Sequence, residues 1–149
     1  MSLENCPDEN LKIENQLCFT LYRTSRAITQ TYRPFLEEVG LTYPQYLVML
    51  VLWREDGVTL KSVGEQLMLD SGTLTPMIKK MESQGLLRRK RSLSDEREIR
   101  ISLTPEGKSL KLKAARVPEK MGCIISLTEE KRLRIQQDLN DLLGQMIGR

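Results

Sequence analysis

The sequence predicts a mainly α-helical fold that contains one small β-hairpin. Two observations lead to this fold class. Apolar side chains recur at helical spacing along most of the 149 residues, and one stretch after Gly85 alternates with a period of two instead. A chain that is 40% hydrophobic and 29% charged can build one domain with a packed core. We therefore expect residues 1–149 to form a single domain.

The first residues and the apolar runs predict a cytoplasmic protein. Residues 1–15 are acidic, which does not match a secretory signal. The longest apolar run, Tyr46 to Trp53, is far shorter than the roughly 20 residues that cross a bilayer. No membrane contact is expected.

The composition also argues against most enzyme classes. The chain has no histidine, which excludes the HExxH zinc helix, Cys2His2 fingers and triads with an imidazole base. It has no CxxC, GxSxG, GxGxxG or Walker motif. We expect neither an enzyme nor a bound metal or cofactor. Three cysteines in a reducing compartment leave core packing or redox chemistry as their roles.

The first third of the chain predicts two helices. One is long, covers residues 11–33 and ends at Pro34, because apolar residues recur there without an internal Gly or Pro. The run QYLVMLVLW after Pro44 is apolar nearly all round, which predicts a short helix that is buried on most sides.

Two further short helices follow, each with a capping residue. Thr59 can cap LKSVGEQLML, and Asp70 or Ser71 can cap TLTPMIKKMESQ, which Gly85 ends. The apolar stripe of the second helix consists of Leu74, Ile78 and Met81.

The strands LLRRKR and REIRISL, joined by a turn at SLSDE, predict a two-stranded hairpin. Thr104 and Pro105 open another helix, which is expected to end near Pro118. A last helix is expected to begin at Ser126 or Thr128.

The middle of the chain therefore reads as a winged helix-turn-helix over residues 43–103. Residues 79–100 carry eight Lys and Arg against four Asp and Glu, a basic block suited to phosphates. The second helix of such a pair lies in the major groove, and an arginine at the hairpin tip can enter the minor groove. The exposed candidates are Ser71, Thr73, Thr75 and Lys79 on the helix and Asp95 and Arg97 at the tip.

Sequence motifs then point to a family. The wing DEREIRISLTPEGK resembles the signature of the multiple antibiotic resistance regulator (MarR) family. The stretches ENQLCFTLYRTSR and LDSGTLTPMIKKMESQGLLRR are similar to the organic hydroperoxide resistance regulators (OhrR) within it. The resemblance implies a homodimeric repressor of palindromic double-stranded operator DNA, which dimerises through residues 11–33 and 105–149. It places Ser71, Thr73, Thr75, Pro76 and Lys79 on the recognition helix and makes Arg97, held by Asp95, the minor-groove residue.

Cys18 is the candidate redox sensor. Helical spacing puts it on a semi-polar side together with Tyr22, Ser25, Thr29 and Tyr32, although packing remains an alternative role. The resemblance implies that two tyrosines, matching Tyr32 and Tyr43, donate hydrogen bonds to the reactive thiol. Fourteen helical residues span about 21 Å. A contact between Tyr32 and Cys18 therefore requires a second subunit.

Cys123 is the candidate second cysteine. It lies between Pro118 and the last helix, and both Pro118 and Gly122 are expected to weaken helical order around it. The resemblance to the two-cysteine branch implies a disulfide with Cys18 of the other subunit. Otherwise Cys123 is a small apolar residue and a low-molecular-weight thiol caps Cys18. Cys6, in the acidic N-terminal stretch, is read as incidental.

The predicted function is thus a repressor that organic hydroperoxides release from DNA through Cys18. Other interpretations stay open. The chain could be a MarR-type repressor released by a small aromatic ligand, with structural cysteines. From other classes, it could be a thiol peroxidase or a dimerising interaction module without DNA binding.

Overall fold

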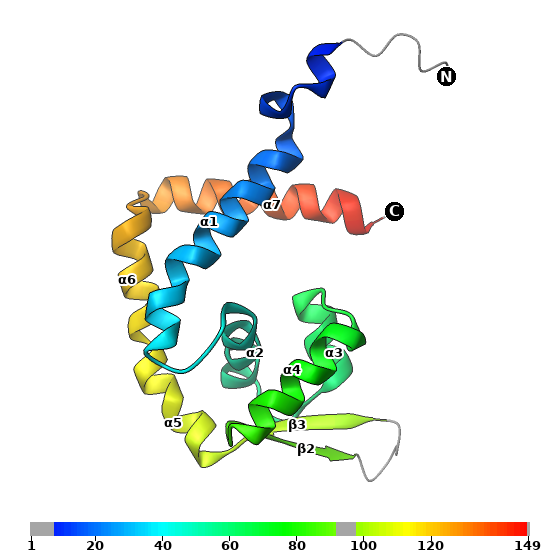
Figure 1. The fold of residues 1–149 in the computed structure, drawn as a ribbon, viewed down its shortest axis with the longest axis vertical. Coiled ribbons are helices and arrows are strands. Elements are labelled where there is room, and N and C mark those ends of the chain that lie inside the picture. The colour runs from blue at the N-terminus through cyan, green and yellow to red at the C-terminus, as the bar shows by residue number, and fades with distance from the viewer. Residues whose placement is uncertain (1–7, 92–97, 149) are drawn as a thin grey trace. The chain divides into compact units, whose positions relative to one another are not determined.

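The computed structural model describes residues 8–91 and 98–148. The chain divides into two compact units, with the boundary between Val117 and Pro118. The first unit contains five helices and a small sheet, and the second contains most of α6 together with α7 (Figure 1). Within the described ranges, no helix is both long enough and apolar enough to cross a membrane.

Helix α1 covers Leu17–Glu37, so the predicted bounds of 11–33 are wrong at both ends. Two 3₁₀ turns, Asp8–Leu11 and Ile13–Asn15, precede it, and Gln16 between them and α1 is extended. As a consequence, Cys18 is the second residue of α1 and does not lie in its interior.

Pro34 lies inside α1 and does not end it. The proline lacks only the N–H that would reach Gln30, and one missing bond near a helix end is tolerated when the helix packs well. Gly40 turns the chain after the helix, because its φ of +70° lets Leu41 N–H donate to Leu36 C=O at 3.0 Å.

Helix α2 covers Tyr43–Arg54 and confirms the predicted buried helix. Gln45 closes its first turn by accepting a hydrogen bond from Thr42 N–H at 2.9 Å. Most of its surface lies in the core of the first unit, through the buried residues Gln45, Tyr46, Val48, Met49, Val51 and Leu52.

Helices α3 (Leu60–Leu67) and α4 (Ser71–Ser83) confirm the predicted helix pair and its caps. Thr59 Oγ1 accepts from Ser62 N–H at 3.0 Å, and Asp70 Oδ1 accepts from Thr73 N–H at 2.9 Å. The predicted stripe of α4 is fully buried and consists of Leu74, Ile78 and Met81. Gly85, with φ of +75°, ends this helix as predicted.

The sheet has three antiparallel strands, so the predicted two-stranded hairpin is incomplete. Strands β2 (Leu87–Arg91) and β3 (Ile99–Leu103) form the hairpin, and β1 (Val58–Thr59) pairs on the other side of β3. The register places Val58 opposite Ile101, and both side chains are buried. A two-residue strand is too short to show an alternating pattern, which is why the sequence did not reveal β1.

Helix α5 covers Pro105–Ala114 and begins at Thr104 as predicted, because Thr104 Oγ1 accepts from Gly107 N–H at 3.0 Å. The expected end near Pro118 is wrong. Helix α6, Arg116–Ile125, contains Pro118 in its first turn, where a proline is tolerated. Cys123 is consequently on a helix, contrary to the expected loosened segment.

Helix α7 covers Glu129–Ile147 in the second unit. It begins at Thr128, one of the two predicted caps, whose Oγ1 accepts from Lys131 N–H at 3.3 Å. Large apolar side chains remain exposed along it, namely Leu133, Ile135, Leu139, Leu143, Met146 and Ile147.

Candidate functional site: a DNA-reading helix and a thiol sensor

Helix α4 is the DNA-reading candidate, and it packs against α3 and β2 (Figure 1). Its buried stripe faces the core, so its other side chains face outward. Of the predicted DNA-binding residues on it, Thr75 is half-buried and the exposed ones are Ser71, Thr73, Pro76 and Lys79. Ser71, Thr75 and Lys79 follow each other at intervals of four, which places them along one side of the helix.

The hydroxyl of Thr73 is already engaged within the protein. It donates to Asp70 Oδ2 at 2.9 Å, while the Thr73 N–H donates to Oδ1 of the same carboxylate. These hydrogen bonds from Thr73 lower the pKa of Asp70 below its ordinary value. Thr73 therefore serves first as part of the cap of α4, a role for which the sequence offered only Asp70 or Ser71.

An ion pair fixes α4 against the wing. Both oxygens of the Glu82 carboxylate accept from Arg89, one from its backbone N–H and one from Nε, each at 2.8 Å. The hydrogen bonds from Arg89 lower the pKa of Glu82. Because Arg89 lies in the middle of β2, this contact sets the angle between the recognition helix and the hairpin.

Asp56 links the turn before β1 to the end of β3, and the sequence analysis did not predict this role. Its Oδ1 accepts from Leu103 N–H at 2.8 Å and from Gly57 N–H at 2.9 Å, and its Oδ2 lies 3.4 Å from Lys108 Nζ. An Asp-Gly pair signals a turn, but its partner 47 residues away could not be inferred from spacing.

The predicted tip residues Asp95 and Arg97 lie outside the described residues. The hairpin still carries several exposed cations, which are Arg88, Lys90, Arg91 and Arg100. Of these, Arg100 is tied down, because its Nη1 donates to Gly57 C=O at 3.1 Å and its Nη2 lies 3.5 Å from Glu98.

The thiol of Cys18 is exposed in the first turn of α1. One turn later, Tyr22 receives a hydrogen bond on its hydroxyl from Arg26 Nη1 at 3.1 Å, and the same guanidinium lies 5.6 Å from the Tyr22 ring centre. Arg26, which the sequence reasoning missed, therefore adds a cation to the helix side that carries Cys18.

The structure brings Tyr32 and Tyr43 together. Their ring centres are 4.9 Å apart, and the ring of Tyr46 lies 6.0 Å from that of Tyr32. Burial, and then the nearby Tyr43, raises the pKa of Tyr32, so its phenol keeps its proton and can donate a hydrogen bond at neutral pH. Tyr46 was not predicted, although it follows Tyr43 by about one helical turn.

The structure does not bring Cys18 to these tyrosines within one chain. Both Cys18 and Tyr32 lie on the continuous helix α1, which separates them by about 21 Å along the axis. Cys123 is exposed in the last turn of α6, in the second unit. Cys6 is outside the described residues.

Comparisons with known proteins identify relatives over almost the whole chain. A family model described as transcriptional regulator SarA/Rot matches residues 30–114. The organic hydroperoxide resistance transcriptional regulator of Bacillus subtilis is 51% identical over 129 residues, which cover 87% of this chain and 86% of that protein.

Two solved structures of AbfR from Staphylococcus epidermidis are also similar. Reduced AbfR bound to DNA is 38% identical with a TM-score of 0.76, and the match covers 95% of this chain and 99% of that one. AbfR with a disulfide formed is 40% identical with a TM-score of 0.62, over 91% and 96% of the two chains.

Proposed function

Since this chain belongs to the MarR family of DNA-binding transcriptional regulators and is of the OhrR type, we propose that it is a repressor released by organic hydroperoxides. In this proposal the reduced homodimer binds a palindromic operator through α4 and the wing. Oxidation of Cys18 then ends that binding.

The observation that carries the proposal is the contact between Tyr32 and Tyr43. The two rings lie 4.9 Å apart on one chain, while the exposed residue Cys18 lies about 21 Å from Tyr32 along α1. A hydrogen bond to the thiolate favours the form that attacks peroxides. The pair can serve Cys18 only if the thiol comes from the other subunit, so the sensor requires a dimer.

The position of Cys18 also suits a reactive thiol. It is the second residue of α1 and is exposed, so a hydroperoxide can reach it. Arg26 adds a positive charge two turns along the same side. Phe19, the next residue of α1, supplies apolar surface on the adjoining side of the helix, which suits peroxides with organic substituents.

Exposed apolar side chains account for the homodimer. They lie on α7 and at the start of the described chain, where Leu11, Ile13 and Leu17 are exposed. A monomer seldom leaves so many large apolar residues in water, and burial of such surface drives association. We propose that these two regions form the dimer interface.

The chemistry proceeds in two steps. The Cys18 thiolate attacks the outer oxygen of the hydroperoxide and becomes a sulfenic acid, while the organic alcohol leaves. The thiol of Cys123 from the partner then attacks the Cys18 sulfur, forming a disulfide and releasing water. The relative AbfR, which has been solved in a disulfide form, supports this second step.

Release from DNA follows from the spacing of the two recognition helices. A dimer reads a palindrome only when its two α4 helices lie one DNA turn apart, about 34–36 Å. Because Cys18 directly follows Leu17 of the proposed interface and Cys123 lies on α6 shortly before α7, a bond between them changes the geometry of the interface. Any resulting change in the separation of the helices prevents them from docking together.

A gel-shift titration on palindromic operator DNA tests the proposal. Cumene hydroperoxide should release the wild type, leave Cys18→Ser bound, and produce a dimer-sized disulfide band that is absent from Cys123→Ser. Hydrogen peroxide, tested in parallel, should react more slowly. Release that persists in Cys18→Ser would contradict the proposal and direct attention to a small ligand.

The same titration also decides the role of Cys123. If a low-molecular-weight thiol must be added for release, Cys123 is structural and the sensor uses one cysteine. If release needs only the peroxide and fails in Cys123→Ser, the two-cysteine mechanism is supported.

A further inference from the structure

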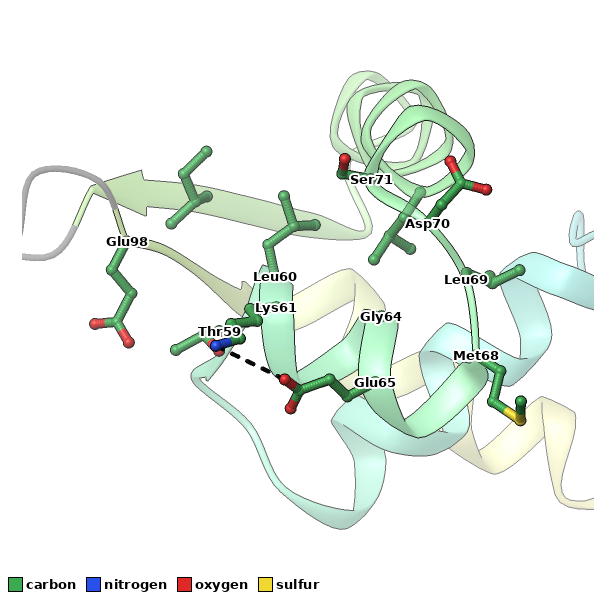
Figure 2. A pocket seen from close by; sticks show the side chains of 12 residues that line it. Thr59, Leu60, Lys61, Gly64, Glu65, Met68, Leu69, Asp70, Ser71 and Glu98 are labelled. Carbon is green, nitrogen blue, oxygen red and sulfur yellow. Dashed lines mark ion pairs between the residues drawn. The ribbon is translucent and has the colours of Figure 1, made fainter. Parts of the chain in front are cut away.

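A cavity of about 830 Å³ opens beside the recognition helix. Its walls come from α3, from the turn to α4, from the start of α4 and from β3 (Figure 2). Its volume lies within the roughly 300–1,000 Å³ typical of small-molecule sites in proteins. None of the proposed sensor residues lines it.

The cavity combines an apolar surface with negative charge. Leu60, Leu69, Leu74 and Ile99 are buried or half-buried, and the Met68 side chain, which is exposed, forms part of the rim. Apolar rings or chains can therefore bury surface here.

Among the described residues, the charged ones that line the cavity are Glu65, Asp70, Glu98 and Lys61, a net charge of −2 from three carboxylates and one cation. Lys61 already lies 3.8 Å from Glu65, as Figure 2 shows, and Asp70 is occupied in capping α4. Glu98 lies 3.5 Å from Arg100, which is not part of the lining.

An excess of negative charge is unexpected in a cavity beside the helix that is proposed to bind DNA. Three carboxylates repel phosphates, so the cavity is not a phosphate subsite, and they equally disfavour carboxylate and phenolate ligands. A cation without apolar groups would gain little binding free energy, because each carboxylate already interacts with a group of the protein. The complementary ligand is positively charged and mostly apolar.

We propose that this cavity binds organic cations with apolar arms, such as quaternary ammonium or phosphonium compounds. The apolar arms contact Leu60, Leu69 and Ile99, and the charge lies between Glu65 and Glu98. This site is independent of the cysteines and of the proposed peroxide response.

The cavity also shares a wall with the DNA-reading helix. Ser71, the first residue of α4, lines it, and Glu98 leads into the wing strand β3. A ligand in the cavity therefore occupies space beside the surface that approaches DNA. We expect ligand and operator to compete, and linkage requires each to weaken the other by the same factor.

Calorimetric titration of the full-length Cys18→Ser protein with tetraphenylphosphonium tests the site, because this variant removes the peroxide chemistry. One ion should bind per chain, and its affinity should fall as salt is added. Tetraphenylborate has nearly the same shape with the opposite charge and should bind at least tenfold more weakly. Tetramethylammonium, which lacks apolar arms, should not bind measurably.

Variants of the lining locate the bound ion. Glu65→Gln and Glu98→Gln should each weaken tetraphenylphosphonium binding by roughly three- to tenfold, since each removes one nearby charge. The control Glu106→Gln, an exposed residue on α5, should bind the ion as the parent does. Unchanged affinity in both lining variants, or equal binding of the borate, would overturn the proposal.

Fluorescence anisotropy with labelled operator tests the competition. Saturating tetraphenylphosphonium should weaken operator binding in the Cys18→Ser protein, and the double variant Glu65→Gln/Glu98→Gln should need a correspondingly higher concentration. Operator affinity that does not change when the ion is bound would overturn the competition. Since the variant lacks Cys18, neither result depends on whether the peroxide proposal holds.

Discussion

At the scale of single residues, Gly107 marks a close approach between two parts of the first unit. A Cβ atom at this position would lie 2.0 Å from the backbone oxygen of Leu86, far inside contact distance. The carbonyl of Gly107 also accepts a hydrogen bond from Trp53 Nε1 at 2.9 Å. A single glycine therefore lets α5 pack against the end of the recognition helix.

We predict that Gly107→Ala destabilises the protein by about 1–3 kcal/mol or more, because backbone atoms must move to admit the methyl group. Urea unfolding of the reduced protein measures the loss in the free energy of unfolding. Gly122→Ala is the matched control, since Gly122 lies within α6 and a Cβ added there meets no other described part of the chain within 4 Å. The control should be neutral or stabilising, by up to about 1 kcal/mol. Equal effects of the two changes would contradict this packing argument.

Residue roles with local partners could be predicted from the sequence, and those with distant partners could not. The caps at Thr59, Asp70 and Thr104 join residues three apart, so spacing alone identifies them. Asp56 and Gly107 depend on contacts with Leu103 and Leu86, which only the folded chain brings close. No local pattern distinguishes such residues from ordinary turn or helix residues.

At the scale of elements, Thr104 joins the recognition helix to α5. Its buried hydroxyl caps α5 and donates to Gly85 C=O, just past α4, at 2.5 Å. Thr104→Val has almost the same shape but neither hydrogen bond. It should lower the free energy of unfolding by about 1–3 kcal/mol. Thr104→Ser keeps both hydrogen bonds and should lower the free energy of unfolding much less. Chemical denaturation of the two variants side by side makes this comparison, and equal losses would show that the hydroxyl is unimportant.

The contact between α4 and β2 should respond to pH through Glu82. Its pKa is lowered from an ordinary 4.5 by hydrogen bonds from Arg89, so folding favours its ionised form. The stabilisation is complete above about pH 4.5 and is lost as the pH falls through the lowered pKa, because protonation then removes the acceptor charge. We predict that Glu82→Gln is less stable than the wild type at about pH 6 and that the difference shrinks towards about pH 3.

Unfolding by urea across this pH range measures the difference. Glu106→Gln keeps the pair between Glu82 and Arg89 and should follow the wild type. A constant difference between Glu82→Gln and wild type at every pH would mean that size or packing matters at this position, and that charge does not.

Prediction of elements succeeded where a periodic pattern was long and failed at prolines and short strands. The buried run of α2 was predicted, and the helix pair α3 and α4 was predicted together with its caps. Pro34 and Pro118 were read as helix ends, yet α1 and α6 contain them, since packing and the first-turn position outweigh one lost hydrogen bond. The strand β1 is visible only through its pairing with β3.

At the scale of the whole molecule, the relatives confirm the predicted fold class and the interpretation as a transcriptional regulator, against that as an enzyme. The proposed sensor is harder to predict, because the proposal requires a second chain. Tyr32 and Tyr43 lie together within one chain, and the proposal takes the thiol from the partner. Such a contact leaves no local pattern in the sequence, so only the length of α1 and the resemblance to the family pointed to it.

A mixed dimer tests this arrangement between subunits. One subunit carries Cys18→Ser and the other carries Tyr32→Phe and Tyr43→Phe, with different affinity tags for purification. If the tyrosines serve the thiol of the other chain, the only remaining Cys18 lies beside the intact tyrosines of the Cys18→Ser subunit. It should then react with cumene hydroperoxide at the wild-type rate, as followed by sulfenic acid trapping. The homodimer with both Phe changes should react at least about tenfold more slowly, as expected from loss of two hydrogen bonds to a thiolate. An equally slow mixed dimer would mean that each chain activates its own cysteine, which the continuous helix between Cys18 and Tyr32 argues against.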